Sequence, residues 1–367
     1  MADLPVSEDY RSLFLVNTPL LDLRSPGEFA HGAFPGAASL PLMTDDERAE
    51  VGTCYKQRGQ AAAIELGHRL VAGSERERRT AAWVEFAKQN PQGYLYCWRG
   101  GLRSQTVQQW LADEGVIYPR IVGGYKALRR FLLEELERSL QQAQLLLVSG
   151  RTGTGKTRVI HALEAALDLE GLARHRGSSF GHLPDPQPSQ IDFENALSIA
   201  FLQRLARGSG PLLLEDEGRL IGRVALPENL RQLMQAAPML VVEEPLDERV
   251  AVILDDYIED LGQRYSARYG VVEGPRMHRT RLLEGLDGIR KRLGGARHQA
   301  LREAMERAFT LQHTTGVTDA HRAWIRELLE LYYDPMYSYQ LAQRDGKVLF
   351  QGTREEVIDY ARSQLPC

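Results

Sequence analysis

The residues Leu145-Leu146-Leu147-Val148-Ser149-Gly150-Arg151-Thr152-Gly153-Thr154-Gly155-Lys156-Thr157 combine an apolar run with a glycine-rich loop. The apolar run predicts a buried parallel strand, and the pattern after the loop predicts a helix from about Lys156 to Leu167. The loop has the spacing Gly-x4-Gly-Lys-Thr in the order strand, loop, helix, which is the context that a phosphate-binding P-loop requires. The sequence therefore predicts a P-loop NTPase-like α/β domain.

This P-loop is expected to bind a diphosphate. Its backbone N–H groups would surround the phosphates, Lys156 would neutralise them, and the Thr157 hydroxyl would bind Mg²⁺ if one is present. The run Leu212–Glu217 predicts a second strand that ends in the acidic residues Glu215, Asp216 and Glu217. Asp216 is a candidate to meet the metal, but the sequence does not decide which of the three carboxylates points inward. The motif does not identify the group attached to the diphosphate. The predicted diphosphate-binding residues are Gly150, Gly153, Thr154, Gly155, Lys156 and Thr157.

A polar segment, Arg176-Gly177-Ser178-Ser179-Phe180-Gly181-His182, lies between the predicted strands. It would meet the carboxyl end of a strand, which is the edge where parallel sheets bind ligands. An ordinary loop is the alternative. Arg249, which follows the strand predicted at Met239–Val242, is a further candidate to contact phosphate. The predicted substrate-binding residues are therefore Arg176, Ser178, Ser179, His182 and Arg249.

A second loop, Cys97-Trp98-Arg99-Gly100-Gly101-Leu102-Arg103, follows an apolar strand and precedes a predicted helix, Arg103–Glu114. A thiol at a helix N-terminus beside two guanidinium groups favours the thiolate, because the helix dipole and both charges stabilise an anion. The two glycines leave room for N–H groups to surround a sulfur or selenium atom carried on the thiol. Cys97, Arg99 and Arg103 are thus the predicted catalytic residues, and a small buried structural cysteine is the alternative.

The chain length of 367 residues favours two domains. We expect residues 1–137 to form a small parallel α/β sheet, residues 138–367 to form the P-loop domain, and the charged helical stretch Tyr125–Gln144 to join them. The C-terminal region from Asp247 reads as mostly helical, and Lys347–Phe350 predicts a strand without an assigned place. Strands are expected at Leu20–Leu23, Ala37–Leu42, Tyr94–Tyr96, Ile117–Ile121, Leu145–Val148, Leu212–Leu214 and Met239–Val242; helices at Ser74–Gln89, Asp287–Thr310 and His321–Tyr332.

The composition, 43% hydrophobic and 26% charged residues, is that of a globular protein, and no apolar run approaches the roughly 20 residues of a membrane span. The N-terminus lacks a secretory signal pattern, so a cytoplasmic protein without a membrane partner is expected. Cys54, Cys97 and Cys367 are too few and too scattered for a disulfide framework or a zinc site. This cysteine content fits a reducing compartment.

The formal net charge of −4 argues against general coating of nucleic acid, so only a local patch could bind RNA. The segment from Arg276 to Arg297 contains seven cationic residues against Glu284 and Asp287. A nucleic-acid patch and a solvated helical face both remain open for this segment.

The cysteine loop resembles the active-site loop of rhodanese domains, in which Cys-x5-Arg surrounds a persulfide. The segments Asp22–Phe29, His31-Gly32 and Pro35–Ala37 resemble the first motif of that fold, and Gly123-Gly124-Tyr125 resembles its closing motif. The resemblance implies a rhodanese-like domain in which Asp22 and Arg24 are structural. The long insertion from about Met43 to Arg79 departs from a minimal rhodanese domain.

The order of Cys-Trp-Arg-Gly-Gly, the P-loop and Arg-Gly-Ser-Ser-Phe-Gly resembles the bacterial tRNA 2-selenouridine synthases over nearly the whole chain. This resemblance implies that selenium from selenophosphate replaces sulfur in the wobble 2-thiouridine of tRNAs for lysine, glutamate and glutamine. It also implies geranyl transfer from geranyl diphosphate to the sulfur, and a tRNA partner bound near its anticodon. A selenophosphate supplier is a further expected partner, and no tightly bound cofactor is implied.

Three other functions remain open at this point. The first is a rhodanese-type sulfurtransferase fused to an ATPase or kinase. The second is an ATP-dependent tRNA thiolase, although the chain shows no adenylating pyrophosphate-loop motif. The third is a noncatalytic module that binds tRNA or phosphate, in which the environment of Cys97 would have no use.

Overall fold

The computed structural model describes residues 4–208, 210–344 and 346–364, so Cys367 lies outside the described residues. The chain forms two units, residues 1–139 with 189–207 and residues 140–188 with 208–367. The expected division after residue 137 assigns residues 189–207 to the second domain, whereas this segment, helix α9 (Gln190–Arg207), packs on the first unit. It does so because Ile199 and Leu202 share a core with Leu13 and Phe14.

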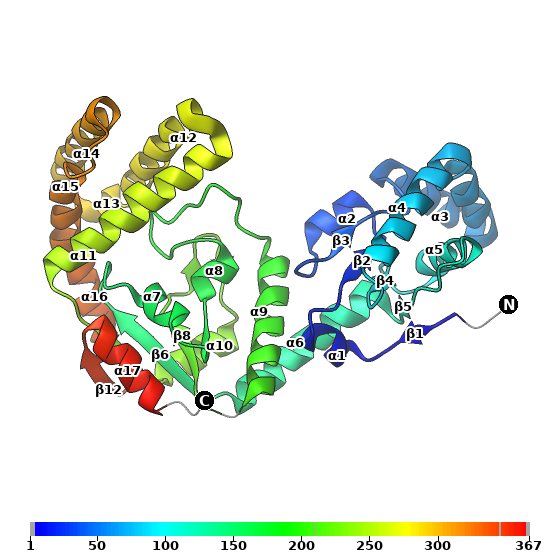
Figure 1. Ribbon diagram of the computed structural model, residues 1–367, viewed down its shortest axis with the longest axis horizontal. Helices are drawn as coiled ribbons and strands as arrows, with labels where there is room; N and C mark the ends of the chain where they lie inside the picture. Colours follow the sequence, from blue (N-terminus) through cyan, green and yellow to red (C-terminus); the bar gives the residue numbers. More distant parts are fainter. Residues whose placement is uncertain (1–3, 209, 345, 365–367) are drawn as a thin grey trace. The chain divides into compact units, whose positions relative to one another are not determined.

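The first unit contains, among its described residues, a five-stranded parallel sheet in the order β1-β5-β4-β2-β3 (Figure 1). Strands β2 and β4 pair Leu21 with Leu95, and both side chains are fully buried. Because parallel strands end at the same edge, the loops after β2 and β4, which carry Arg24 and Cys97, lie at one edge of the sheet. The strands are β1 (Val6–Ser7), β2 (Leu20–Asp22), β3 (Ala38–Ser39), β4 (Tyr94–Tyr96) and β5 (Arg120–Ile121).

The insertion from Met43 to Arg79 forms α3, whose helical backbone is broken by a kink at Gly59 (φ 83°), and the start of the next helix. Buried Arg79 anchors the insertion to the sheet domain, since its guanidinium donates to the Leu42 carbonyl (2.5 Å) and to Glu47 (2.9 Å). The helices of this unit, in addition to α9, are α1 (Tyr10–Leu15), α2 (Pro26–His31), α3 (Asp45–Leu70), α4 (Gly73–Gln89), α5 (Leu102–Asp113) and α6 (Gly124–Gln142), which runs across the unit boundary.

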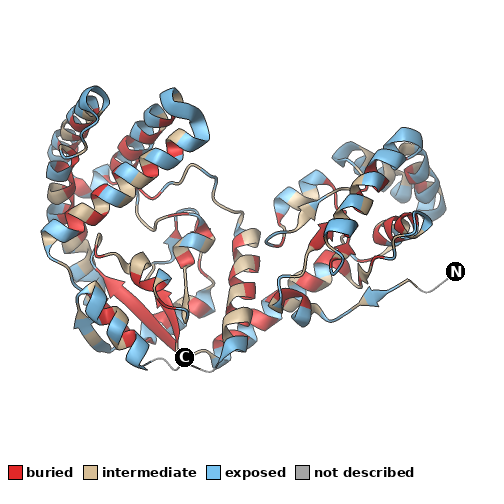
Figure 2. Ribbon diagram, viewed as in Figure 1, coloured by how far each residue is buried: buried red, intermediate tan, exposed pale blue. Residues whose placement is uncertain are grey.

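The second unit has, within the part of the chain that the structure describes, a five-stranded parallel sheet in the order β12-β11-β6-β8-β7. Every residue of β6 is buried, as Figure 2 shows, which confirms the buried parallel strand predicted before the P-loop. The strand predicted near Lys347–Phe350 is β12, and it pairs with β11 at one edge. The strands are β6 (Leu145–Gly150), β7 (Ala166–Leu167), β8 (Leu212–Glu215), β11 (Met239–Val242) and β12 (Val348–Gly352), with a separate hairpin of β9 (Leu220–Ile221) and β10 (Val224–Ala225).

The helix predicted from Lys156 to Leu167 is wrong at its C-terminal end. Helix α7 ends at His161, and Ala166 and Leu167 form the edge strand β7. The Ala165 carbonyl accepts the Leu213 N–H (3.2 Å), so pairing with β8 satisfies the backbone groups that a longer helix would have satisfied internally.

The C-terminal region is mostly helical, as predicted, and has an apolar core of its own. Two of its turns are π-helical, which is rare in proteins. The expected helix Asp287–Thr310 is interrupted before α14, where Gly294 adopts a φ of 89°. The helices of this unit are α7 (Lys156–His161), α8 (Leu169–Ala173), α10 (Glu228–Ala236), α11 (Leu246–Ile253), η1 (Leu254–Asp260), α12 (Leu261–Gly288), α13 (Arg290–Leu293), α14 (Gly295–Thr315), α15 (His321–Leu328), η2 (Leu329–Tyr333), α16 (Asp334–Leu341) and α17 (Arg354–Gln364).

Candidate active sites: a thiol loop and a phosphate loop

Cys97 directly follows β4 and lies beside the first turn of α5. Its side chain is buried, and the thiol donates to the Ser104 hydroxyl (3.3 Å), which in turn donates to the Gly101 carbonyl (2.9 Å). The thiol is therefore held at a helix N-terminus, in the position that the sequence predicts. Sequence reasoning missed Ser104, which lies in the first turn of α5, because no motif in the sequence marks this serine.

The loop after Cys97 packs backbone to backbone against the start of α6. Gly100 has a φ of 62°, and a Cβ atom there would lie 2.6 Å from the Ile121 carbonyl oxygen and 2.7 Å from the Gly123 nitrogen. The Tyr125 N–H donates to the Cys97 carbonyl (2.8 Å) and so ties the two segments together. A side chain at Gly100 would force this loop open, which explains the glycine.

Of the two predicted arginines of this loop, Arg103 faces an acidic partner and Arg99 is exposed. The Arg103 guanidinium donates to both carboxylate oxygens of Glu28 (2.6 and 3.2 Å), and Arg48 adds a second ion pair to the same carboxylate. Burial alone would raise the pKa of Glu28, but the hydrogen bonds and charge of Arg103 outweigh it and lower the pKa to about 2. Part of the positive charge predicted beside the thiol is therefore balanced by Glu28.

The Glu28 and Arg103 pair is expected to make the stability of the first unit depend on pH. A carboxylate whose pKa falls from 4.5 to about 2 on folding stabilises the protein above pH 4.5, and this contribution is lost as the pH falls toward 2. The Glu28→Gln variant should therefore be less stable than the wild type by on the order of 3 kcal/mol at pH 7, with a gap that narrows between pH 5 and pH 3. Urea unfolding followed by tryptophan fluorescence measures this gap.

An exposed carboxylate of the same unit, Glu77, supplies the matched control. The Glu77→Gln variant should unfold like the wild type at both ends of this pH range. A Glu28→Gln gap that stays constant from pH 7 to pH 3 would contradict the ionised pair.

The residues that the resemblance implies to be structural form a buried framework next to this loop. The Arg24 guanidinium donates to Asp22 (2.7 Å) and to the Gly32 carbonyl (2.7 Å), and neither charged side chain is exposed. The Tyr96 hydroxyl also donates to Asp22 (2.7 Å), and the Arg24 guanidinium lies 3.7 Å from the centre of the Tyr125 ring. This network joins β2, β4 and α6 and so fixes the edge from which Cys97 emerges.

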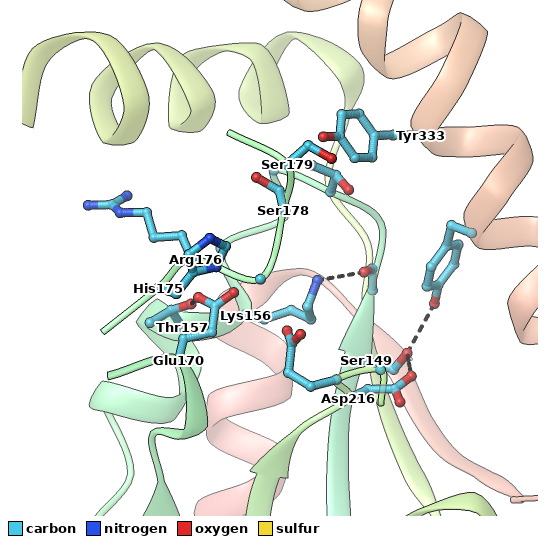
Figure 3. Close-up of a pocket in the computed structure, with 18 of the residues that line it drawn as sticks. Ser149, Lys156, Thr157, Glu170, His175, Arg176, Ser178, Ser179, Asp216 and Tyr333 are labelled. Carbon is cyan, nitrogen blue, oxygen red and sulfur yellow. Dashed lines mark hydrogen bonds between the residues drawn. The ribbon is translucent and has the colours of Figure 1, made fainter. Parts of the chain in front are cut away.

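In the second unit, the P-loop joins β6 to α7 (Figure 3). Lys156 donates to the Gly150 carbonyl (2.9 Å), and the Thr154 hydroxyl donates to the Arg151 carbonyl (2.9 Å). Gly155 adopts the left-handed conformation with a φ of 78° and lies at the N-terminus of α7. The loop therefore curls around the end of α7, where N–H groups are available for a phosphate.

Arg249 contacts the back of this loop. Its guanidinium donates to the Thr152 carbonyl (2.9 Å) and to both carboxylate oxygens of Asp334 (3.0 and 2.5 Å), and the side chain is 2% exposed. These hydrogen bonds hold the guanidinium against the loop backbone and Asp334. The structure thus places Arg249 where it supports the loop, and sequence reasoning missed its partner Asp334, which lies far away in the chain.

A cavity of about 1330 Å³ opens over the P-loop. Two further predicted residues do not line it: Thr154 is buried within the loop, and His182 lines a second cavity of about 730 Å³. Asp216 lines the large cavity, but it accepts from Ser149 (2.7 Å) and pairs with Arg344. The predicted residues brought together around the large cavity are Gly150, Gly153, Gly155, Lys156, Thr157, Arg176, Ser178, Ser179 and Asp216.

Half-buried carboxylates face Lys156 and Thr157 in this cavity, and sequence reasoning missed Glu170 among them. The Thr157 hydroxyl donates to Glu170 (3.1 Å), whose own N–H donates to Glu215 (3.1 Å). Burial raises the pKa of Glu170 to about 7, and burial together with the Glu170 charge raises the pKa of Glu217 to about 8, although Lys156 opposes both shifts. This carboxylate cluster therefore holds protons at neutral pH.

The backbone of Gly177 lies close to this cluster. Its φ is 42°, and a Cβ atom there would lie 2.5 Å from one Glu170 oxygen and 2.9 Å from one Glu217 oxygen. The segment around Arg176 and Ser178 is thereby brought against the carboxylates, as Figure 3 shows. This close approach explains the glycine in the predicted substrate segment.

Replacing Glu217 with glutamine is expected to stabilise the second unit at high pH. A carboxyl group whose pKa rises from 4.5 to about 8 on folding costs stability as the pH rises through that interval, because the unfolded state releases its proton first. The melting temperature of Glu217→Gln should exceed that of the wild type by roughly 4 °C at pH 8.5 and by less than roughly 1 °C at pH 5. Calorimetry at both pH values measures this.

The exposed Glu303 of the same unit provides a comparison variant, Glu303→Gln, which should shift neither melting temperature. An increase for Glu217→Gln that is equal at both pH values would show that Glu217 does not hold a proton in the folded state.

Among residues 4–208, 210–344 and 346–364, no group of three or more His, Cys, Asp or Glu side chains is placed to hold a metal ion by itself. Magnesium ions are commonly held by one or two carboxylates together with substrate phosphates and water. The Thr157 hydroxyl and the Glu170 carboxylate beside the loop fit such a shared site. In the described part of the chain, no helix is both long and apolar enough to cross a membrane.

The cationic segment from Arg276 to Arg297 lies on α12, α13 and the start of α14. Arg276 pairs with Glu273 (2.8 Å) and Arg281 with Glu284 (2.7 Å), each one turn along the helix. These pairs reduce the net charge that the segment presents. A role in RNA binding stays a prediction.

Comparison with known proteins identifies the family. A family model described as the tRNA 2-selenouridine synthase AAA domain matches residues 143–366. The tRNA 2-selenouridine synthase of Marinobacter nauticus is 52% identical over 364 residues, which cover 99% of each chain. That of Hahella chejuensis is 55% identical over 355 residues, 96% of this chain and 93% of its own, and that of Pseudomonas putida KT2440 is 52% identical over 98% of both.

These matches span both units and include both loops. The predicted architecture, a rhodanese-like parallel-sheet domain followed by a P-loop α/β domain with a helical region, agrees with the two parallel sheets of the structure and with the matched AAA domain. The chain therefore belongs to the tRNA 2-selenouridine synthase family.

Proposed function

We propose that this protein replaces sulfur with selenium in the wobble 2-thiouridine of tRNAs for lysine, glutamate and glutamine, using selenophosphate as the selenium donor and an S-geranyl nucleoside as the intermediate. The observation that carries the proposal is that one chain of this family holds both a thiol at a helix N-terminus and a P-loop with its cavity. These loops suit two successive half-reactions on one acceptor.

The chemistry requires two steps because the thiocarbonyl carbon of 2-thiouridine is a poor electrophile with a poor leaving group. In the first step, the sulfur attacks C1 of geranyl diphosphate, the C1–O bond breaks and diphosphate leaves. In the second step, the selenium of selenophosphate attacks C2 of the base, the C2–S bond breaks and geranyl thiol leaves. Hydrolysis of the Se–P bond then releases phosphate and leaves 2-selenouridine. Alkylation thus converts the sulfur into a group that can depart.

For the first step, we assign the diphosphate to the P-loop. The N–H groups at the start of α7 and the Lys156 ammonium would stabilise the negative charge that develops on the departing diphosphate. Lys156 bonds to the Gly150 carbonyl in this structure and would exchange that bond for a phosphate oxygen. If Mg²⁺ takes part, Thr157 and Glu170 would hold it, and it would supply further charge neutralisation.

For the second step, we assign selenophosphate to the Cys97 loop, where the thiol would position the selenium atom for attack while it is still bonded to phosphorus. Arg99 is exposed, so its guanidinium could turn toward the phosphate of selenophosphate and attract it. Arg103, which is paired with Glu28, lies beside the loop. The N–H groups at the start of α5 would stabilise an anionic chalcogen. The tRNA would present its anticodon region to both sites, and a selenophosphate-producing enzyme is the expected supplier.

Incubation of the protein with 2-thiouridine-containing tRNA and geranyl diphosphate, with and without selenophosphate, tests the function. Nucleoside mass spectrometry should show a geranyl adduct without selenophosphate and 2-selenouridine with it, and ATP should have no effect. No mass change in either reaction would overturn the proposal and favour a sulfurtransferase joined to a nucleotide-binding domain.

A further inference from the structure

A small apolar pocket adjoins the phosphate cavity within the second unit. Thr152 of the P-loop and Ser178 of the polar segment line both spaces, as do Ile253, Tyr257 and Tyr333. The pocket therefore opens directly beside the site assigned to the diphosphate. Its lining also includes Phe180, Leu282, Trp324, Ile325 and Leu328.

The walls away from this opening are hydrocarbon. Leu282, Trp324 and Ile325 are buried and belong to the core of the helical region. The polar groups lie at the mouth, where the Ser178 and Tyr257 hydroxyls are 3.0 Å apart and Tyr257 donates to the Arg176 carbonyl (3.3 Å). Beyond the hydroxyls of Thr152, Ser178, Tyr257 and Tyr333, these walls offer no hydrogen-bond partner to a ribose or a nucleobase, whose polar atoms would lose their hydrogen bonds there.

The backbone around the pocket departs from regular helix at two places. Tyr257 lies on the π-helical turn η1 and Tyr333 on the π-helical turn η2, and such turns occur frequently at functional sites. Figure 3 shows the Tyr333 ring beside Ser178 and Ser179. Two independent irregular turns thus place an aromatic ring at the same opening.

A glycine on α12 brings the pocket wall close to the phosphate site. A Cβ atom at Gly285 would lie 2.8 Å from the Ser179 carbonyl oxygen and 2.9 Å from the Phe180 ring. The absence of a side chain there allows Phe180, two residues after Ser178, to reach the apolar wall. The same short segment therefore contacts both the cavity and the pocket.

We propose that this apolar pocket binds the hydrocarbon chain of the prenyl diphosphate and sets the chain length that the protein accepts. This inference rests on the proposed function, in which the P-loop holds the diphosphate of the same molecule. The free volume of the pocket is about 20 Å³, which is room for roughly one water molecule. A prenyl chain enters only when the wall side chains shift, so small changes in wall volume should change the accepted length.

The test compares two leucines of the same core that are both fully buried. Leu282 lines the pocket and Leu301 does not. Geranyl and farnesyl diphosphates are supplied at equal concentration to 2-thiouridine tRNA, and the two S-prenyl nucleosides are quantified by mass. Leu282→Ala should raise the ratio of farnesyl to geranyl product by about tenfold, and Leu301→Ala should leave the ratio at the wild-type value.

A second variant narrows the pocket and does not depend on a cavity being tolerated. Leu328→Phe should lower geranyl transfer by about tenfold while dimethylallyl transfer, which needs less space, stays near the wild-type rate. Competitive inhibition by inorganic diphosphate should be unchanged in all three variants, because the P-loop is intact. This inhibition also shows that each variant is folded.

The outcomes separate this inference from the proposed function. In one outcome, the wild type transfers prenyl groups, Leu282→Ala and Leu301→Ala give the same ratio of farnesyl to geranyl product, and Leu328→Phe slows dimethylallyl and geranyl transfer equally. The pocket then does not bind the prenyl chain, and the proposed function stands. If the wild type transfers no prenyl group, both are overturned.

Discussion

Replacing Cys97 with alanine is expected to abolish selenium transfer while S-geranylation continues near the wild-type rate. The buried thiol is the group to which we assign selenium, so its loss should reduce 2-selenouridine formation by roughly three orders of magnitude or more. The P-loop lies in the other unit and keeps its own contacts. The geranylated and selenated nucleosides, quantified separately by mass, give both rates from one reaction.

Cys54 is the matched control, since it is the other free cysteine among the described residues. The Cys54→Ala variant should retain both activities. Loss of both activities in a Cys97→Ala variant with wild-type thermal unfolding would contradict the assignment of one step to each loop.

Replacing Lys156 with alanine is expected to lower S-geranylation by about 10²- to 10³-fold. Lys156 is the cation at the predicted diphosphate site, and its removal leaves the negative charge that develops on the departing diphosphate without this counter-charge. Single-turnover geranylation with saturating geranyl diphosphate measures this effect on the chemical step. Selenation that starts from 2-thiouridine should fall in parallel, because it needs the geranylated intermediate.

Lys347, an exposed lysine of the same unit, supplies the control variant Lys347→Ala, which should keep the wild-type rate. A Lys156→Ala variant that geranylates normally would contradict the placement of the diphosphate on the P-loop.

Local sequence patterns predicted most of the fold because its strands are short apolar runs followed by diagnostic loops. The run at Leu145–Val148 and the spacing of the P-loop specify β6 and α7, and Tyr94–Tyr96 with the cysteine loop specifies β4 and α5. The two-residue strand at Ala166–Leu167 was missed because so short a strand shows no alternation and is defined only by its pairing with β8.

Long-range packing accounts for what the sequence could not predict. Helix α9 lies between strands of the second unit in the chain, but Asp192 accepts the Ala33 N–H (2.6 Å) and Asn195 donates to the Ala33 carbonyl (2.8 Å) in the first unit. Similarly, Arg249 reads as a phosphate ligand in sequence, whereas its partner Asp334 becomes visible only in three dimensions. Charge pairs between distant segments leave no local pattern.

The candidate sites show the same division. The loop residues Cys97, Lys156 and Thr157 follow from motif spacing. Glu170 was not predicted, because a single carboxylate in a helix has no distinguishing neighbours in the sequence. Its proposed role depends on the hydrogen bond that it accepts from the Thr157 hydroxyl. The apolar pocket was likewise unpredictable, since its lining comes from segments between Thr152 and Tyr333.

In the proposed function, the two loops catalyse two successive steps, and the most direct test is to supply the S-geranylated intermediate to a variant that cannot make it. The Lys156→Ala variant should be given tRNA that already carries S-geranyl-2-thiouridine, together with selenophosphate, and the appearance of 2-selenouridine followed by mass. We predict conversion at close to the wild-type rate, because the step assigned to the P-loop has been bypassed. If this variant still fails to form 2-selenouridine while the wild type succeeds on the same tRNA, the P-loop is required for selenium transfer itself and the division of labour is wrong.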